Sequence, residues 1–422
     1  MSSPHVLLCA YQCGPGMGSV SQIGWEWYSR LSKKTRVTLV THVRNRSALA
    51  GAGAPFGDSE IIYIDTEWFA GPLNRLAKRL FPRSEHSVFL LSSLDFYIYD
   101  AQAVKLLRRA MPLSYQVIHA VTPVSPLAAT RLYKLKLPLI LGPWNGGLAS
   151  PKTFPEIMKQ DSGWLYGVRS LGRMLDGFLG STRNASRILV ATQATEGSLP
   201  ESRRSRTQKM LENGVDLQLF QPASARLNSS NDLLRVLFVG RLIPAKAVSL
   251  LLEAVRRIQD EIPIQLTIVG GGPLLEELRE EAERKGISRN VEFSGNLPLE
   301  QVREHMQQTD LFCLPSVRES GGAVLIEAMA CAVPVAGVRW GGPGEIVDEE
   351  VGRVLSADGP EALISDLIRL FREVYHEPEA WKRKGLAGRK RAEQKYGWDA
   401  KINAALEIYA DILKTSLRKS YV

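Results

Sequence analysis

The sequence has few cysteines and no long hydrophobic run. Its four cysteines, Cys9, Cys13, Cys313 and Cys331, are too few for a disulfide framework, and none lies in the paired spacing of a zinc site. No stretch approaches the ~20 apolar residues of a membrane-spanning helix, and the N-terminus lacks the basic segment and apolar run of a signal peptide. We therefore expect a cytoplasmic protein whose thiols are reduced and packed.

Signatures of several other chemistries are missing too. The sequence has no metal-ligand cluster, no G-x-S-x-G nucleophile elbow, no G-x-x-x-x-G-K-[ST] phosphate loop and no nucleic-acid-binding motif. We expect neither a metal site nor a nucleic-acid partner. The loop GPGMGSV (14–20) resembles a dinucleotide-binding turn, but Ser19 stands at the third glycine position and the next strand ends in His42 instead of an acid, which argues against NAD.

Charge is unevenly distributed along the 422 residues, whose net charge is +9. Residues 1–210 hold 26 Lys and Arg against 13 Asp and Glu, a net charge of +13, which leaves −4 for residues 211–422. The basic half is compatible with anionic head groups or phosphorylated ligands, and equally with a solvated surface. The stretch LNRLAKRLFPR (73–83) could rest on an anionic membrane at its cytoplasmic face, or pack as an ordinary exposed helix.

Short apolar runs alternate with helical patterns throughout the chain, which predicts an α/β fold with two doubly wound parallel sheets. The length also favours two large domains. The predicted strands of the first half lie within 5–12, 36–42, 60–64, 115–121, 137–143 and 186–193, and those of the second within 233–242, 264–273, 290–297, 311–316, 333–338 and 351–356. We place the domains at 1–197 and 198–395, followed by a C-terminal helix at 396–422 that packs back on the first domain.

The segment ESGGAVLIEAMA (319–330) has the residue types of a site for a sugar diphosphate. If a helix begins near Ala323, its free amides and positive dipole end can bind a phosphate, and Gly321 and Gly322 allow close approach. Glu319 and Glu327 flank this helix end, and a carboxylate accepts hydrogen bonds from paired sugar hydroxyls. The alternative is that Glu319 faces solvent and Glu327 pairs with a neighbouring base.

Two further segments follow predicted buried strands. In VGRLIPAK (239–246), Arg241 and Lys246 lie near the carboxyl end of a strand and could offset charge on a departing diphosphate. In TIVGGGPLLEEL (267–278), a ligand could approach Gly270 and Gly271, although a tight turn alone would also explain these glycines.

The first half offers weaker candidates. His119 is expected to end the strand YQVIHAV and face the same crevice, although a packed structural histidine is the commoner case. Trp144 and Asn145, in LGPWNGGLASP (141–151), could supply a stacking face and an amide donor to an acceptor from a flexible loop, or form an ordinary turn.

The second half resembles the retaining glycosyltransferases of family 4, which have the GT-B fold. The resemblance covers residues 213–347 and rests on the ordered segments NGVD, VGRL with Lys246, VGGGP, FSG, the two glutamates of 319–330, and GGPGEIV. It is looser over residues 1–200, where it depends on the glycine loop, His119 and GPWNGG.

The resemblance implies residue roles. Arg241 and Lys246 would hold the donor diphosphate, Glu319 would contact the transferred sugar, and Glu327 would bind the nucleotide ribose. His119 would line the reaction side. The other implied donor-site residues are Gly16, Gly18, Gly240, Gly270, Gly271, Ser320, Gly321, Gly322, Ala323 and Glu345.

The resemblance also implies an activity. Such an enzyme would need no cofactor or metal and would move a hexose from a UDP- or GDP-sugar to a glycan or lipid-linked acceptor, in cell-surface polysaccharide synthesis, with the anomeric configuration retained. Two alternatives stay open, a non-catalytic nucleotide-sugar-binding subunit and a GT-B-fold nucleotide-sugar epimerase.

Overall fold

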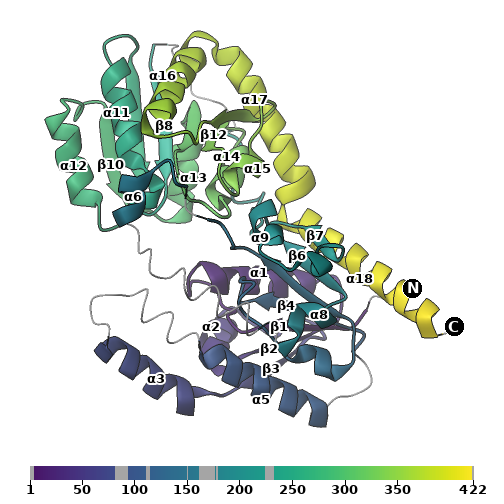
Figure 1. Cartoon of the computed structure of the whole chain (residues 1–422). Helices are drawn as coiled ribbons and strands as arrows, with labels where there is room; N and C mark the ends of the chain where they lie inside the picture. The colour runs from purple at the N-terminus through teal and green to yellow at the C-terminus, as the bar shows by residue number, and fades with distance from the viewer. Residues whose placement is uncertain are drawn as a thin grey trace. The chain divides into compact units, whose positions relative to one another are not determined.

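The computed structural model describes residues 4–80, 94–110, 115–149, 151–160, 176, 179–223 and 232–420. The chain forms two compact units (Figure 1). The first comprises Met1–Gly147, Tyr166–Glu212 and Ile402–Val422, and the second comprises Leu148–Leu165 and Asn213–Lys401. Each unit therefore draws on more than one stretch of the chain.

The first unit contains a parallel sheet of seven strands in the order β3-β2-β1-β4-β5-β6-β7. Strands β1, β2, β4 and β5 are almost wholly buried, as expected for apolar strands covered on both faces. The strands are β1 (Val6–Ala10), β2 (Val37–His42), β3 (Glu60–Ile64), β4 (Val117–Thr122), β5 (Leu139–Trp144), β6 (Arg187–Val190) and β7 (Thr207–Lys209).

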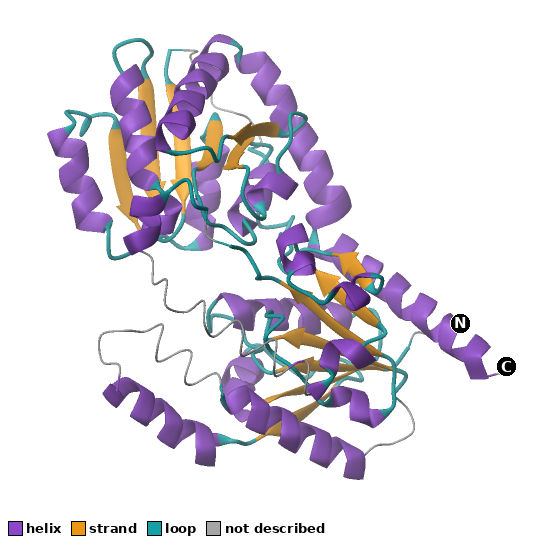
Figure 2. Ribbon diagram, viewed as in Figure 1, coloured by secondary structure: helices purple, strands orange, loops and turns teal. Residues whose placement is uncertain are grey.

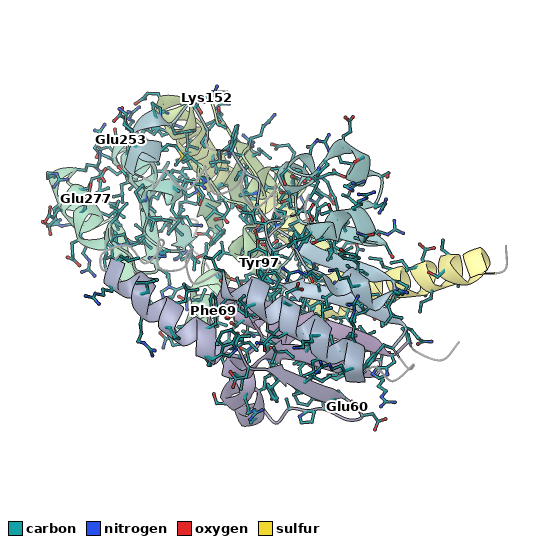
Figure 3. The ribbon with its side chains drawn as sticks, turned by 60° about the horizontal axis from the view of Figure 1, so that its bottom comes forward. Glu60, Phe69, Tyr97, Lys152, Glu253 and Glu277 are labelled. Carbon is teal, nitrogen blue, oxygen red and sulfur yellow. The ribbon has the colours of Figure 1, made fainter. Side chains whose placement is uncertain are left out.

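Helices pack around this sheet (Figure 2). They are α1 (Ser19–Leu31), α2 (Arg46–Gly51), α3 (Glu67–Leu80), α5 (Asp95–Ala110), α8 (Ser181–Asn184), α9 (Gln193–Gly197) and α10 (Glu201–Arg204), with the 3-10 turns η1 (Val43–Asn45) and η2 (Leu132–Leu135). Helix α3 lies beside α5, in the foreground of Figure 3.

The C-terminal helix α18 (Trp398–Ser420) packs on the first unit from Ile402 onward, as the sequence predicts. Three contacts fix it there. The hydroxyl of Tyr409 lies 2.6 Å from Nδ1 of His119, Lys34 donates a hydrogen bond to Asn403 at 2.6 Å, and Arg187 forms an ion pair with Asp411 at 3.1 Å.

The second unit contains a parallel sheet of six strands in the order β10-β9-β8-β11-β12-β13. Its strands are β8 (Leu234–Val239), β9 (Ile264–Val269), β10 (Val291–Gly295), β11 (Leu311–Leu314), β12 (Val335–Val338) and β13 (Gly352–Leu355). Its helices are α6 (Pro155–Gln160), η4 (Pro244–Lys246), α11 (Val248–Ile258), α12 (Leu275–Arg284), α13 (Leu299–Gln307), α14 (Ala323–Ala330), α15 (Pro343–Ile346), α16 (Pro360–His376), α17 (Pro378–Arg391) and η5 (Ala392–Tyr396).

Both strand orders are those of doubly wound nucleotide-binding folds, so the predicted fold class is confirmed. All twelve predicted strands are present. The sequence analysis missed only β7 among the described strands, because its three residues are polar and partly exposed. No helix among the described residues is long and apolar enough to cross a membrane.

Candidate functional site

The loops after β8 and β11 meet at the carboxyl edge of the second sheet. The strand order changes direction between these two strands, and open α/β sheets bind ligands outside the carboxyl ends of strands at such a switch point. The loops comprise residues 240–246 and 315–322. They contain Arg241, Lys246 and Glu319, three of the predicted site residues.

Two contacts join these loops. The amide of Val317 donates a hydrogen bond to the carbonyl oxygen of Ala245 at 3.0 Å. The Lys246 ammonium forms an ion pair with Oε2 of Glu319, and each side chain keeps 18% of its surface exposed. The structure thus brings together two predicted residues that lie 73 positions apart in the sequence. Arg241 follows β8 directly, with an exposed side chain.

A second loop fixes the main chain of Glu319. Glu319 pairs with Gly341 in an isolated parallel bridge, and its carbonyl oxygen accepts a hydrogen bond from the amide of Gly342 at 3.0 Å. A Cβ on Gly342 would lie 2.2 Å from the carbonyl oxygen of Gly321, so only glycine allows this approach. Glu345, on the short helix α15 that follows, is exposed.

Helix α14 begins at Ala323, directly after the loop 315–322, and this is the start that the sequence predicts. Its N-cap Gly322 has φ = 87°, a left-handed conformation that favours glycine. The amides of Ala323 and Val324 donate no hydrogen bond to any residue that the structure describes, whereas Leu325 bonds to the Gly322 carbonyl at 2.9 Å. Two free amides and the positive end of the helix dipole therefore lie beside the Lys246–Glu319 pair, a combination that can bind a phosphate.

Glu327 lies one turn further along α14. Its carboxyl makes no hydrogen bond or ion pair within the described part of the chain, which contradicts the alternative that it pairs with a base. Removal from solvent raises the pKa of this carboxyl to about 7. The side chain is partly exposed, so a ligand can reach its carboxyl oxygens, and they can accept hydrogen bonds from the ligand's hydroxyl groups.

The glycines between β9 and α12 have a structural reason of their own. A Cβ on Gly270 would lie 2.0 Å from the carbonyl oxygen of Gly240. One on Gly271 would lie 2.8 Å from Nδ2 of the Asn296 side chain. The Leu242 amide donates to the Gly271 carbonyl at 2.9 Å. These glycines hold the β8 loop in place, and their predicted contact with the donor stays a prediction.

In the first unit, the loop before α1 carries Gly16 and Gly18. Both have positive φ, 71° and 102°, and Gly18 caps α1 without a side-chain hydrogen bond. The loop is exposed, and Gln22 accepts a hydrogen bond from the Gly16 amide at 3.4 Å. Its predicted place beside the donor is a prediction that this unit alone does not test.

His119 differs from its predicted position. It is the third of six residues in β4 and fully buried, so the expectation that it ends the strand is wrong. Nε2 donates to the carbonyl oxygen of Gly142 at 2.8 Å, and Nδ1 accepts from the hydroxyl of Tyr409 at 2.6 Å, which fits a neutral ring. Both ring nitrogens are occupied, so the ring anchors α18 to the sheet.

Trp144 also differs from the expectation of a stacking face in a flexible loop. It is the last residue of β5 and only 2% exposed, because its indole packs in the apolar core. Asn145 follows it, and its side-chain amide donates to Glu212 at 2.6 Å. Glu212 is 4% exposed, and sequence reasoning missed it because no motif marks it.

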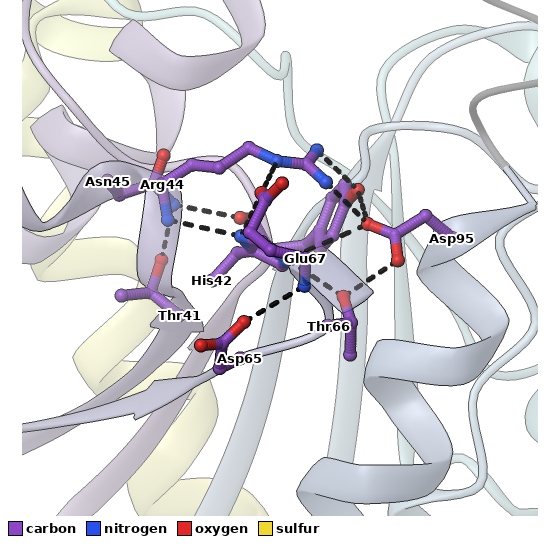
Figure 4. Close-up of polar contacts among 9 residues, drawn as sticks. Thr41, His42, Arg44, Asn45, Asp65, Thr66, Glu67 and Asp95 are labelled. Carbon is purple, nitrogen blue, oxygen red and sulfur yellow. Dashed lines mark hydrogen bonds and ion pairs between the residues drawn. The ribbon is translucent and has the colours of Figure 1, made fainter. Parts of the chain in front are cut away.

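A polar network at the carboxyl ends of β1, β2 and β3 was also missed (Figure 4). The buried carboxylate of Asp95 accepts hydrogen bonds from Tyr11 at 2.7 Å, Arg44 at 3.0 Å and Thr66 at 2.7 Å. His42 lies 2.8 Å from the Thr66 hydroxyl, and burial lowers its pKa. Because Asp95 lies far from these strands in the sequence, no local sequence pattern predicts the network. The polar groups of this network hydrogen-bond to one another, so the network fixes the carboxyl ends of the three strands.

Other features of the described residues add little chemistry. No three His, Cys, Asp or Glu side chains of that part of the chain lie close enough together to hold a metal ion. A cavity with an empty volume of about 420 Å³, open solvent included, lies between α5 and the first sheet. Its lining is mostly apolar and includes Phe96, Tyr99 and Trp144.

The two doubly wound sheets define an α/β protein with two Rossmann-like units, the second with free helix amides at its switch point. Residues 221–388 match the family model described as Glycosyl transferases group 1.

Curated relatives carry related names. A D-inositol 3-phosphate glycosyltransferase of Streptomyces bingchenggensis is 33% identical over 218 residues, which are 48% of this chain and 47% of the relative. A GDP-mannose-dependent alpha-(1-6)-phosphatidylinositol monomannoside mannosyltransferase of Mycolicibacterium smegmatis is 32% identical over 203 residues, 44% of this chain and 51% of the relative. The chain thus spans about half the length of the curated relatives it matches.

Solved structures confirm the GT-B fold over the whole chain. HepE of Anabaena, in complex with UDP, has a TM-score of 0.65 at 18% identity, with 97% of this chain and 100% of that one covered. The sucrose-phosphate synthase of Thermosynechococcus elongatus has a TM-score of 0.63 at 19% identity, with 98% and 100% covered.

Proposed function

We propose that the protein is a retaining glycosyltransferase of family 4. It moves a hexose from a UDP- or GDP-sugar to a hydroxyl of a glycan or lipid-linked saccharide in cell-surface polysaccharide synthesis, and it works in the cytoplasm. The observation that carries the proposal is the group formed by the free amides of α14, the Lys246–Glu319 pair and the unpaired Glu327. Supporting it, a relative is named as GDP-mannose-dependent, and HepE was solved with UDP.

The diphosphate of the donor binds at the N-terminus of α14. It takes hydrogen bonds from the amides of Ala323 and Val324 and draws the Lys246 ammonium away from Glu319. The freed carboxylate of Glu319 then accepts hydrogen bonds from the sugar hydroxyls. Glu327, one turn further along, accepts the ribose hydroxyls.

Sugar transfer breaks the bond between the anomeric carbon and the phosphate oxygen and forms one to the acceptor oxygen. The acceptor proton leaves with the nucleoside diphosphate or to solvent. Negative charge grows on the departing diphosphate, and Lys246 and Arg241 offset it, which is why we propose that no divalent metal is needed.

The test is release of UDP or GDP from a panel of nucleotide sugars, with and without glycan acceptors. The proposal expects acceptor-dependent release that a chelator leaves unchanged. No release from any donor would support a binding subunit, and an altered sugar without acceptor would support an epimerase. Abolished activity in chelator would contradict the assigned role of the two cations.

A further inference from the structure

Helix α3 carries more apolar surface than it packs. At about 100° per residue, an arc of roughly 200° around the helix is apolar except for Arg79, and it holds Trp68, Pro72, Leu76, Leu80, Leu73, Ala77 and Ala70. The part of this arc that packs inward holds Ala70 and Ala77, which are 5% and 0% exposed. The other part holds Trp68, Leu76 and Leu80, which are 65%, 50% and 57% exposed.

Three large apolar side chains on one exposed helix face are unusual. Scattered exposed leucines need no explanation, but a row with a tryptophan on a single face marks a contact surface. Here Leu76 and Leu80 lie about 80° and about 120° around the helix from Trp68, so the three side chains share one side of it. We call them, together with Arg75 and Arg79, the outer face of α3.

Two cations lie beside Trp68 on the same face. Arg75 and Arg79 are exposed and form no ion pair with any residue in the described ranges. By the same geometry they lie within about 20° of Trp68 on either side of it. At the start of the helix, Glu67 is neutralised by an ion pair with Arg44. The outer face is therefore apolar and positively charged.

We propose that the outer face of α3 lies flat on an anionic lipid bilayer. Apolar side chains beside arginines suit the boundary between head groups and acyl chains, where tryptophan also partitions. The net charge of +13 on residues 1–210 adds attraction to anionic head groups. A contact between two copies of this face would bring their arginines together and is disfavoured.

The inference extends the proposed function, since a lipid-linked acceptor lies at such a surface. Only the purpose of the membrane contact, access to a lipid-linked acceptor, rests on the proposed function. Vesicle binding is measured without donor or turnover, so a failure here leaves sugar transfer untouched, and a failure of sugar transfer leaves vesicle binding untouched.

The experiment measures sedimentation of the full chain with vesicles of phosphatidylcholine, with and without phosphatidylglycerol. We expect binding that requires phosphatidylglycerol and weakens with salt. Leu76→Glu with Leu80→Glu removes it, and Arg75→Ala with Arg79→Ala weakens it by roughly 25-fold, at about 5-fold per charge.

Matched controls lie in the second unit. Leu299→Glu changes a leucine that is 54% exposed on α13, and Arg279→Ala with Arg284→Ala removes two arginines from α12. Both should bind vesicles like the unchanged chain. Absence of binding to phosphatidylglycerol vesicles, or equal binding by the α3 variants, overturns the proposal. Concentration-dependent dimers that Leu76→Glu abolishes, without vesicle binding, overturn it in favour of an interface between copies.

Discussion

Lys246 and Glu319 form an ion pair between the turn after β8 and the loop before α14. Each is assigned a different part of the donor, the diphosphate for Lys246 and the sugar for Glu319. In the chain without ligand they neutralise each other, which keeps both charges satisfied when few solvent contacts remain. Donor binding then replaces this ion pair with one between Lys246 and the diphosphate. Breaking the first pair offsets part of the binding free energy, while the ligand-free chain avoids two unpaired, partly buried charges.

Lys246→Ala should reduce sugar transfer by ~10²-fold or more, because the leaving diphosphate loses a cation in the transition state. The measurement is kcat from nucleotide release at saturating donor. The matched control is Lys382→Ala, which removes a lysine paired with Glu379 on α17. Turnover near that of the control would contradict the role given to Lys246.

Gly322→Ala should weaken donor binding beyond its effect on folding. A left-handed residue with a side chain costs about 1 kcal/mol of stability, and the helix end would shift away from the phosphate. Gly286→Ala is the control, since Gly286 also has positive φ, 69°, with open space around it. Both variants should lose stability in denaturant titrations, Gly322→Ala more so because its Cβ would lie 3.1 Å from Cδ1 of Leu325, and only Gly322→Ala should lose affinity for the donor in calorimetry. Equal donor affinity in the two would count against a phosphate at α14.

Donor affinity should rise with pH through about 7, the raised pKa of Glu327. The ionised carboxylate accepts the ribose hydroxyls, whereas the protonated form has less acceptor capacity. Calorimetry with UDP-glucose or GDP-mannose between about pH 6 and 8 measures this, as these diesters do not titrate there. Glu327→Gln should make the profile flat, and the exposed Glu300→Gln should not. An unchanged slope in Glu327→Gln would exclude Glu327 as its origin.

The same shift predicts how stability depends on pH. Between about 4.5 and about 7 the folded chain holds a proton on Glu327 that the unfolded chain has lost, so stability falls as pH rises across this window. The fall amounts to about 3 kcal/mol at most. Above about pH 7, Glu327→Gln should therefore be more stable than the unchanged chain in urea titrations.

Tyr409→Phe should lower stability by about 1–3 kcal/mol, because it leaves Nδ1 of the buried His119 without its donor. If His119 only anchors α18, kcat should stay near normal while the melting temperature falls. Phe is a conservative change that keeps the packing of the ring. A large loss of kcat with an unchanged melting temperature would restore His119 to the reaction side.

The fold was predictable because most residues of the buried parallel strands are apolar. The apolar runs of β8, β9 and β11 predict strands, and glycines mark the turns after β8 and β9. The strand order was not readable from such patterns. Nor was the passage of the chain into the second unit at Leu148, since no change of composition marks it.

The candidate site was predictable where local chemistry decides it. The Gly-Gly pair before Ala323 predicts both the helix start and its free amides. The burial of His119 and Trp144 was not predictable, because it depends on α18 and on neighbouring strands distant in the sequence. The ion pair of Lys246 likewise arises only when β8 and β11 become neighbours.

The most direct measurement is a crystal structure of the chain with a bound UDP- or GDP-sugar. The account predicts the diphosphate at the amides of Ala323 and Val324, with Lys246 turned from Glu319 to a phosphate oxygen and Glu327 on the ribose. A nucleotide sugar bound away from α14, with the Lys246–Glu319 pair intact, would contradict it.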